Sequence, residues 1–460
     1  MSCSCWRERA VKNLSHDRSQ NRERVKGKFM KNLEDIDATS PENLRDPYPY
    51  YARLRDEAPV FRDPKTGIVS VSTYDLVLEV NKRPKIFSSN FASLLNSGGK
   101  GRFDEEEETI LAEGLRRCNT MLTADPPDHS RYKRIAMQAL PHSRIMAMAP
   151  YIAEVTNGLI DKFSADGKVE FKSQFAEMLP GIVIADALGI PREDIPMFQS
   201  WVRAAILRLN GNAKPEERPA LARSEIAMQK YFREAMAERR TNPGDDVVSD
   251  LIQASMPTEE GERPLDEAEI YSIVQQIFTA GQEATAHALT YALAQLLANP
   301  EQLEALMSDD TLVANMVEEA VRHLSPSHNM WRIVKQDTVL GGVELKAGEP
   351  MLIRYGSANR DESKFDNAGK FDVSRENAKN HIAFGAGVHT CLGMTLARLE
   401  MVTALPIVLK RLKNLRFANP EDPFSFATSH ILRGVQSLEL AFDPEESAEQ
   451  RADDRILEAN

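Results

Sequence analysis

Apolar residues recur along most of this chain at the three-to-four-residue spacing of amphipathic helices. The pattern predicts helices over 47–57, 74–82, 131–163, 174–189, 192–208, 219–240, 264–297, 301–307, 311–324 and 392–412. Short Val- and Ile-rich segments bounded by turns predict strands over 59–62, 68–72, 332–334, 338–345 and 350–354. We therefore expect a mainly α chain with small β-sheets, and no internal repeat or low-complexity linker interrupts it.

Composition narrows the class of protein. The chain has 460 residues, of which 42% are hydrophobic, enough for a large core. No run of 18 uncharged apolar residues occurs, and the N-terminus is polar from Met1, so we expect neither a membrane anchor nor a secretory signal. A net charge of −12 argues against nucleic acid as a partner.

The four cysteines, Cys3, Cys5, Cys118 and Cys391, are too few for a disulfide framework and fit a reducing cytoplasm. Cys3 and Cys5 form a Cys-x-Cys pair that is a weak metal-binding candidate, but no further ligands lie nearby, which favours a bystander role. The predicted location is therefore cytoplasmic.

Charge is uneven along the chain. Residues 1–31 carry nine Lys or Arg and three acids, whereas 104–108 and the tail from Asp443 are acidic. The basic leader is either a weak nucleic-acid or membrane patch or a solvated arm, and translation could also start later. We expect 1–35 to be a disordered extension, 36–442 a catalytic domain and 443–460 an acidic tail.

The most informative segment runs from Phe384 to Gly393 and reads Phe-Gly-Ala-Gly-Val-His-Thr-Cys-Leu-Gly. Its cysteine, Cys391, precedes a predicted helix, where backbone N–H groups favour a thiolate. Such a thiolate can ligate haem iron, and the glycines would let the backbone approach a flat macrocycle. A buried free cysteine in a tight turn is the alternative. The full string resembles the haem-binding loop of the cytochrome P450 family.

Further segments strengthen this resemblance, which spans about 36–442 and implies a single-domain, mainly α fold. Glu319 and Arg322 match the family's Glu-x-x-Arg pair, three residues apart on one helical face. Arg375 resembles the arginine that completes a buried network behind the haem loop. These three residues are expected to be structural.

The resemblance also implies which residues hold haem b, iron protoporphyrin IX. Cys391 would be the axial iron ligand, and His129, Arg332 and His389 match propionate partners, for which charge-assisted hydrogen bonds are suited. The basic residue expected after His129 is Lys133 or Arg134, and the sequence leaves that choice open. Phe384, Gly385, Gly393 and Ala280 complete the predicted haem contacts.

The helix predicted over 264–297 matches the family's distal helix but departs from it at one position. Ala280 and Gly281 fit the groove for dioxygen, and Glu283 fits the acid that helps proton delivery. The threonine expected next is Ala284, and Thr285 lies about 100° further around the helix. Ala284 is either only a good helix former, with ordered water doing the work, or a sign that water held by Glu283 and Thr285, or a substrate hydroxyl, delivers protons.

The resemblance implies an apolar substrate pocket with few polar groups. Its predicted lining is Gln276, Thr279, His328, Asn329, Met330, Ile431 and Leu432. A terpenoid, a steroid, a fatty acid or an aromatic ether would fit.

We therefore expect a monomeric haem-thiolate monooxygenase that uses O2 and electrons from a separate ferredoxin and ferredoxin reductase, because nothing in the chain resembles a fused redox domain. The alternatives are a peroxide-driven peroxygenase or haem-thiolate isomerase, and a non-catalytic haem or ligand sensor.

Overall fold

The computed structural model describes residues 32–92, 105–209 and 213–445, and it divides into two units, 1–38 and 39–460. In the described part of the first unit, Leu33–Asp35 forms a 3-10 turn. The predicted extension over 1–35 lies almost wholly outside the described residues, as does most of the predicted acidic tail. The proposed division into 1–35, 36–442 and 443–460 therefore stays a prediction.

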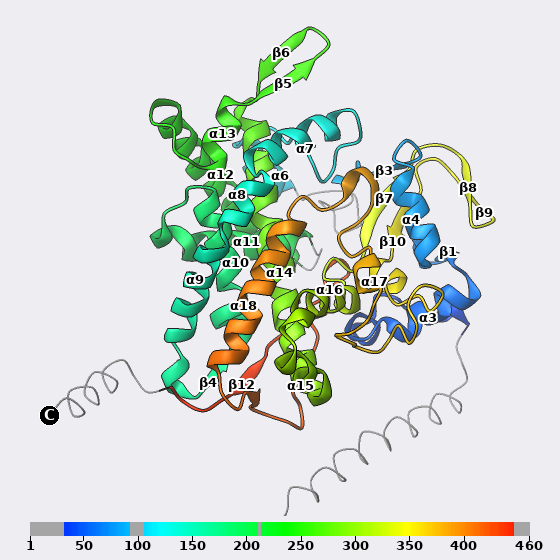
Figure 1. Cartoon of the computed structure of the whole chain (residues 1–460). Coiled ribbons are helices and arrows are strands. Elements are labelled where there is room, and N and C mark those ends of the chain that lie inside the picture. The colour runs from blue at the N-terminus through cyan, green and yellow to red at the C-terminus, as the bar shows by residue number, and fades with distance from the viewer. Residues whose placement is uncertain (1–31, 93–104, 210–212, 446–460) are drawn as a thin grey trace, which may run out of the picture. The chain divides into compact units, whose positions relative to one another are not determined.

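The second unit is mainly helical with small sheets, which confirms the predicted fold class (Figure 1). Its helices are α2 (Pro41–Arg45), α3 (Tyr48–Glu57), α4 (Tyr74–Lys82), α6 (Glu105–Ala112), α7 (Asp128–Ala139), α8 (His142–Ala147), α9 (Ala149–Asp161), α10 (Met178–Ala187), α11 (Ile195–Leu209), α12 (Arg218–Thr241), α13 (Val247–Gln253), α14 (Glu267–Ala298), α15 (Pro300–Ser308), α16 (Val313–Leu324), α17 (Tyr355–Ala358) and α18 (Met394–Arg411).

The strands form one larger sheet and three small ones. They are β1 (Val60–Arg62), β2 (Val69–Val71), β3 (Phe87–Ser88), β4 (Lys168–Glu170), β5 (Ser255–Thr258), β6 (Gly261–Pro264), β7 (Met330–Val334), β8 (Thr338–Leu340), β9 (Val343–Leu345), β10 (Pro350–Ile353), β11 (Arg416–Phe417) and β12 (Glu439–Ala441). The five-stranded sheet has the order β1-β2-β10-β7-β3, in which only β2 and β10 run parallel. In its centre Arg332 pairs with Met351, which fixes the strand that carries this predicted site residue.

The helix predicted over 131–163 is wrong as a single element, because the structure breaks it into α7, α8 and α9. Pro141, just before α8, has extended backbone angles and no N–H to continue the ladder of hydrogen bonds. Pro150 then occupies the first turn of α9, a position that a proline tolerates. Apolar residues keep the same helical spacing across both breaks. The sequence pattern alone therefore does not separate the three helices.

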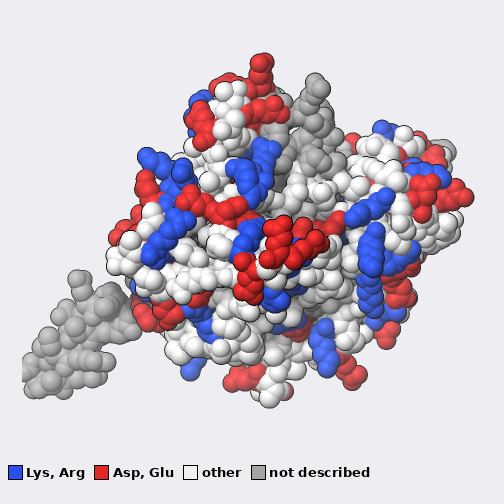
Figure 2. Space-filling model, turned by 90° about the horizontal axis from the view of Figure 1, so that it is seen from above, with Lys and Arg blue, Asp and Glu red and all other residues white. Residues whose placement is uncertain are grey.

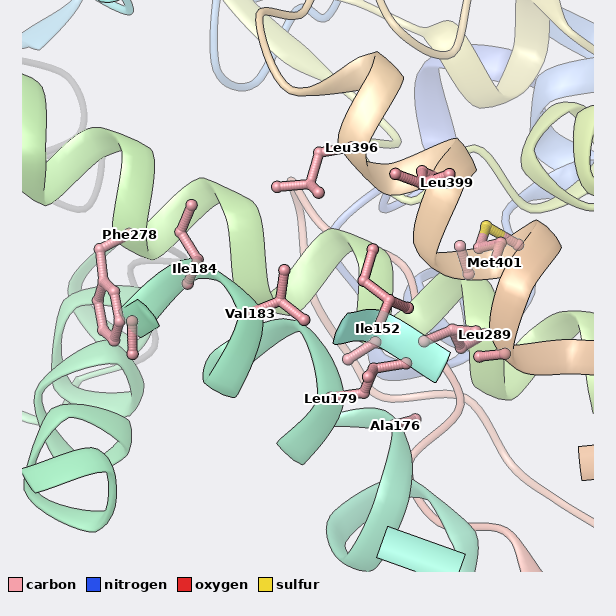
Figure 3. Packing of buried hydrophobic residues seen from close by; sticks show 14 of the residues in the cluster. Ile152, Ala176, Leu179, Val183, Ile184, Phe278, Leu289, Leu396, Leu399 and Met401 are labelled. Carbon is pink, nitrogen blue, oxygen red and sulfur yellow. The ribbon is translucent and has the colours of Figure 1, made fainter. Parts of the chain in front are cut away.

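The long helix α14 is the centre of the core. Asp266 and Glu269 cap its first turn reciprocally, which satisfies backbone N–H groups that a helix start leaves free. It packs against α10, α16 and α18. Figure 3 shows the apolar side chains that meet there, among them Val183 and Ile184 of α10, Phe278 and Leu289 of α14, and Leu396, Leu399 and Met401 of α18. Each such side chain contributes roughly 1.5–3 kcal/mol when fully buried, so this packing holds α14 and α18 in fixed positions.

The surface carries both signs of charge. On the face seen in Figure 2, Lys and Arg side chains lie among Asp and Glu, and acidic side chains gather at its centre. The acidic run from Glu105 forms the start of helix α6. Within the described residues, no helix is both long and apolar enough to span a bilayer.

Candidate active site

The loop before α18 presents Cys391 at the end of a tight turn. The Cys391 N–H donates to the Phe384 carbonyl oxygen at 2.8 Å, and the Gly385 N–H donates to that of Ile382 at 2.9 Å. Gly385 and Gly387 have φ of +73° and +68°, a backbone region that favours glycine. The loop therefore closes on itself through its backbone and holds the cysteine in one place.

The structure shows why residue 387 must be a glycine, which the sequence did not reveal. A Cβ atom there would lie 2.4 Å from the backbone oxygen of Asn81 in α4, so α4 rather than a ligand demands glycine. At Gly393 nothing lies within 4 Å of the corresponding position. Space beside the cysteine is thus left open at Gly393, as the haem interpretation requires.

Cys391 is exposed on the loop while protein surrounds its other sides. This desolvation raises the pKa of its thiol, whereas the Gly393 N–H and the charges of Lys133 and Arg398 act in the opposite direction. A metal ion at the sulfur would remove the thiol proton outright. The backbone N–H group and the positive charges around Cys391 therefore favour a thiolate, which is the form of cysteine that binds a metal cation.

Lys133 and Arg134, between which the sequence could not choose, have different surroundings. The Lys133 ammonium donates to the carbonyl oxygens of Val388 and Thr390 at 2.8 and 2.6 Å, and so fastens α7 to the cysteine loop. Arg134 is exposed to solvent. The geometry gives Lys133 a clear role in supporting the loop and leaves a propionate contact by either residue a prediction.

The three predicted propionate partners are brought together at one place. The rings of His129 and His389 lie 3.9 Å apart between centroids, and the Arg332 guanidinium is buried nearby. Arg332 donates to the Trp331 carbonyl oxygen at 2.7 Å and to Asn81 Oδ1 at 3.4 Å. Burial, with the neighbouring positive charges, lowers the pKa of His129 to about 4 and that of His389 to about 2.

The cluster of His129, Arg332 and His389 contains several hydrogen-bond donors but few acceptors. His129 Nδ1 and His389 Nε2 are buried and have no hydrogen-bond partner among the described residues. The nearest acid, Asp125, already accepts from the Ser88 hydroxyl and the Ser89 N–H. A ligand that brings carboxylates would supply the missing acceptors, so the residues present fit the propionates of haem.

The middle of α14 exposes small residues between two buried stretches. Ala280 is exposed and Gly281 and Ala284 are half-buried, whereas Phe278 before them and Ala286 after them are buried. Neighbouring elements leave this turn of α14 partly uncovered, and its side chains are small, so a flat group has room beside it. This agrees with the predicted distal surface over haem.

Thr285 is buried at 5% exposure, two residues and about 200° around the helix from Glu283. Thr279 instead lies one turn before Glu283 on the same side of α14. The Thr279 hydroxyl oxygen and Glu283 Oε2 are both buried without a hydrogen-bond partner in the described part of the chain. The geometry therefore favours Thr279 over Thr285 as the hydroxyl beside Glu283, and the predicted role of Thr285 is untested.

His287, which the sequence analysis did not single out, lies next to Glu283. Its Nε2 is 3.3 Å from Glu283 Oε1, and its ring is buried. The spacing of four residues on a helix could have revealed this pair, because such side chains are neighbours on one face.

Three polar residues predicted to line the pocket already have protein partners. Gln276 accepts from the Leu122 N–H at 2.8 Å and donates to the hydroxyls of Thr120 and Ser272. The His328 ring stacks on Tyr51, and Asn329 accepts from the Tyr51 hydroxyl and donates to the His430 carbonyl oxygen.

Beside these, Ile431 is buried, and Met330 and Leu432 are half-buried. Ile431 and Leu432 are drawn to the segment before β7, where the His328 N–H donates to the Ile431 carbonyl oxygen. Substrate contact by any of the predicted lining residues stays a prediction.

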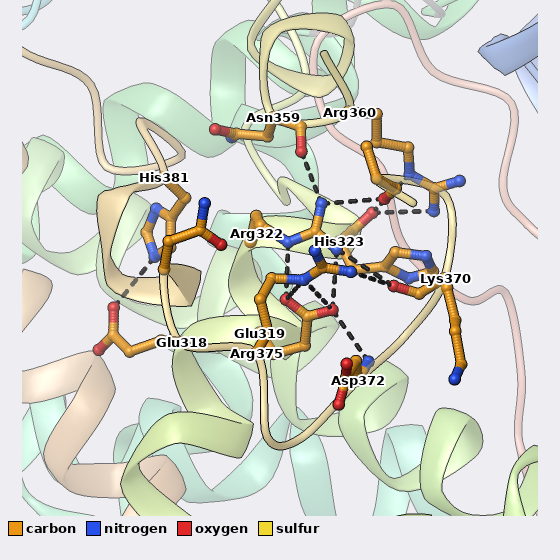
Figure 4. Close-up of polar contacts among 12 residues, drawn as sticks. Glu318, Glu319, Arg322, His323, Asn359, Arg360, Lys370, Asp372, Arg375 and His381 are labelled. Atoms are coloured by element: carbon orange, nitrogen blue, oxygen red, sulfur yellow. Dashed lines mark hydrogen bonds and ion pairs between the residues drawn. The ribbon is translucent and has the colours of Figure 1, made fainter. Parts of the chain in front are cut away.

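The predicted structural residues form one closed network (Figure 4). Arg322 donates twice to the Glu319 carboxylate, at 2.6 and 2.8 Å, and Arg375 Nε donates to the same carboxylate at 3.0 Å. The remaining guanidinium N–H groups reach backbone carbonyl oxygens, including those of Asn359 and Asp366. All three side chains are buried, and a buried ionic group is tolerated when it is satisfied in this way.

A second network, missed in the sequence, lies between α16 and α18. Glu318 accepts from His381 at 3.1 Å and from Nε and Nη2 of Arg398. Although burial opposes it, hydrogen bonds from His381 and Arg398 hold the pKa of Glu318 at about 2. Because Glu318 directly precedes Glu319, one turn of α16 holds two separate ion networks.

Comparison with known proteins agrees with this geometry. The family model for Cytochrome P450 matches residues 69–437. The steroid C26-monooxygenase of Mycobacterium tuberculosis is 32% identical over 394 residues, covering 86% of this chain and 93% of that protein. The structure of cytochrome P450 CREJ in complex with (4-ethylphenyl) dihydrogen phosphate has a TM-score of 0.82 at 26% identity, and covers 89% of this chain and 100% of its own. That of CYP109E1 from Bacillus megaterium in complex with testosterone has a TM-score of 0.73 at 30% identity, and covers 86% and 99%. The chain therefore belongs to the cytochrome P450 family, and it is a haem-dependent monooxygenase.

Proposed function

We propose that this monooxygenase inserts one oxygen atom of O2 into an unactivated C–H bond of a steroid, with Cys391 as the axial ligand of the haem iron. The observation that carries this proposal is the exposed residue Cys391 in a loop that Lys133 fastens, close to buried histidine nitrogens that lack hydrogen-bond partners among the described residues. Haem, when bound, supplies the oxygen-activating chemistry, and the electron-rich thiolate favours O–O cleavage.

The protein's own part is to hold and shield the reactants. His129, Arg332 and His389 would hold the propionates, and Ala280 and Gly281 leave room above the macrocycle. Glu283, with one carboxylate oxygen unpartnered, is the proposed proton donor on the distal side.

The steroid class is supported by the relatives and by the pocket chemistry. One relative is named as a steroid C26-monooxygenase, and one similar structure contains testosterone. With Gln276, His328 and Asn329 engaged by protein partners, the predicted lining offers mainly apolar contacts and the free Thr279 hydroxyl. An apolar skeleton with one polar handle suits such a lining. Terpenoids, fatty acids and aromatic ethers are the next classes to test.

Electrons are proposed to come from a separate ferredoxin that docks where α7 meets the cysteine loop. A pocket of about 420 Å³ opens there, lined by His129, Ser130, Lys133, Arg134, Met137, Gln138 and Val388. Arg134 and Met137 are exposed, which gives one cation and one apolar contact for an acidic partner. Salt should then slow reduction of the haem. A cytoplasmic location and a monomeric state also remain predictions.

The test is optical difference spectroscopy of the purified ferric holoprotein against steroids, terpenoids, fatty acids and methoxyaromatics. We expect a shift of the Soret band to higher energy with a steroid, followed by O2- and reductant-dependent hydroxylation of that steroid. A shift with another class alone would overturn the steroid assignment. Protein that purifies without haem, or a Cys391→Ala variant that keeps the wild-type spectrum, would overturn the role of Cys391.

A further inference from the structure

Three polar residues follow one face of α14 at four-residue spacing. They are Thr279, Glu283 and His287, and each keeps one polar atom, Thr279 Oγ1, Glu283 Oε2 and His287 Nδ1, that is buried without a hydrogen-bond partner in the described parts of the chain. Residues four apart are neighbours on a helix surface, so the three form one continuous polar stripe. Buried polar atoms of this kind are normally satisfied by ordered water.

His287 is the most enclosed member of the stripe. It is 4% exposed, and its Nε2 lies 3.3 Å from Glu283 Oε1. On its other side the ring lies against Gly434, where a Cβ atom would come within 1.9 Å of His287 Nδ1. The imidazole therefore fills the space between Glu283 and the backbone at Gly434.

Gly434 belongs to the segment that carries the predicted substrate contacts Ile431 and Leu432. This segment is fastened by its backbone, since the Ala427 N–H donates to the Gly434 carbonyl oxygen at 3.0 Å and the Arg433 N–H donates to that of Pro326 at 2.8 Å. A displacement at Leu432 can reach Glu283 through the His287 ring, because the ring contacts both Gly434 and Glu283. His287 thus links the substrate side of the pocket to the acid on α14.

We propose that His287 is a positioning residue for proton delivery, and that it holds Glu283 Oε1 so that Oε2 stays turned toward the water and Thr279. The inference rests on the proposed role of Glu283 as proton donor. In that role one oxygen atom of O2 enters the substrate and the other leaves as water, with two electrons that come from reduced nicotinamide through the separate ferredoxin and two protons. Each proton would pass from the Glu283 carboxyl through water to the reacting oxygen, and the carboxylate would regain a proton from solvent.

Two substitutions separate positioning from packing. His287→Gln keeps an N–H donor for Glu283 but loses the ring, whereas His287→Phe keeps a ring against Gly434 but loses the donor. The measured quantity is hydrogen peroxide released per reduced nicotinamide consumed, with haem content and the substrate-induced Soret shift as checks on folding. A second readout that needs no turnover is the C–O stretching frequency of the ferrous carbon monoxide complex, which senses charge on the distal side.

We expect His287→Phe to slow productive proton delivery by roughly tenfold, less than the hundredfold or more that loss of a general acid costs. His287→Gln should stay near wild type. Glu283→Gln should uncouple strongly, and adding His287→Phe to it should make nothing worse, because His287 acts through Glu283. The same C–O frequency shift should appear in His287→Phe and Glu283→Gln. Thr290→Ala, a buried hydroxyl change on the same helix, is the matched control and should leave coupling and frequency unchanged.

The outcomes distinguish the two levels of the proposal. Uncoupling by Glu283→Gln together with wild-type coupling in His287→Phe would overturn the inference about His287 and leave the proposed function standing. Wild-type coupling in Glu283→Gln would overturn the role of Glu283 itself. Loss of haem in His287→Gln with normal coupling in His287→Phe would assign the residue to packing alone.

Discussion

The guanidinium carbon of Arg398 lies 4.6 Å from the centre of the Phe384 ring, so a cation in α18 covers the aromatic residue that begins the cysteine loop. Arg398 is held in this position by the Glu318 carboxylate of α16. Contacts of this kind contribute about 0.5–1 kcal/mol when partly exposed. Through Arg398, helix α16, which also carries the Glu319 network, supports the loop at Phe384.

The Glu318 network should make stability depend on acid. Because the pKa of Glu318 is held at about 2, below its ordinary value of 4.5, its ionised form stabilises the fold above pH 4.5, and this stabilisation is lost as the pH falls toward 2. The full shift corresponds to about 3 kcal/mol. At pH 3 the Glu318 carboxyl of the folded protein is still mostly ionised, so only part of this stabilisation is lost there. We expect the difference in free energy of unfolding between wild type and Glu318→Gln to shrink by about 2 kcal/mol between pH 6 and pH 3, as measured by urea denaturation.

Glu349 offers a control, because it is a half-buried carboxylate paired with the exposed Arg62 and has no contact with the cysteine loop among its hydrogen bonds. Glu349→Gln should change the acid profile much less, since exposed pairs contribute about 0–1 kcal/mol. Burial lowers the pKa of His381 and the Glu318 carboxylate raises it, so Glu318→Gln also changes the acid sensitivity that comes from His381, whereas Glu349→Gln leaves it as in wild type. Equal profiles for Glu318→Gln and Glu349→Gln would show that Glu318 is not the group responsible.

Lys133 and Arg134 should have separable effects although they are adjacent. Lys133→Met removes two hydrogen bonds to the cysteine loop, each worth about 1.5–3 kcal/mol for a charged donor, so we expect weaker haem retention and a less stable carbon monoxide spectrum. Arg134→Met should leave haem content unchanged and slow reduction by an acidic ferredoxin at low salt. Haem loss kinetics and stopped-flow reduction at two salt concentrations measure the two effects. Interchanged results would mean that Arg134 supports the haem and Lys133 the partner.

Two glycines of the loop should respond differently to alanine. At Gly387 the backbone has positive φ and α4 lies too close for a Cβ, so Gly387→Ala should cost about 2 kcal/mol or more and lower the melting temperature. At Gly393 the φ is −84° and no atom lies within 4 Å, so Gly393→Ala should leave the stability of haem-free protein unchanged. Its effect should appear only as reduced haem uptake. Thermal unfolding with and without haem tests both, and equal losses in the haem-free protein would refute the distinction.

The sequence predicted the parts of this protein that depend on local pattern. Amphipathic periodicity found α14 and α18 to within three residues at each end, and motif spacing found Glu319, Arg322 and Arg375 before any contact was known. Periodicity failed at Pro141, where a backbone N–H is missing but the apolar rhythm continues. It also gave no sign of the acidic helix α6, whose residues Glu106 and Glu107 pair with Arg223 and Arg208 from distant elements.

The site was predictable to the level of residue type and less so to the level of contacts. From the sequence, the side chains of Gln276 and Asn329 were predicted to be available to bind a substrate. Their hydrogen-bond partners Leu122 and Tyr51 lie more than 150 residues away along the chain, so no local pattern reveals them. The need for glycine at 387 depends on Asn81, which no local pattern connects to the loop. Long-range packing of this kind decides which polar group stays available to a ligand, and it emerges only from the fold.

The position of Ala284 yields the final prediction. If water held beside Glu283 and Thr279 already delivers protons, adding a hydroxyl by Ala284→Thr should change peroxide release per reduced nicotinamide by less than about threefold, roughly 0.6 kcal/mol. The change should be the same for a steroid with a hydroxyl group and for its hydroxyl-free counterpart. A substrate-assisted path predicts instead that wild type is well coupled only with the hydroxylated steroid, and that Ala284→Thr rescues the other. Measuring coupling for both steroids in both proteins, with equal Soret shifts to confirm equal binding, therefore decides whether the protein or the substrate supplies the missing hydroxyl.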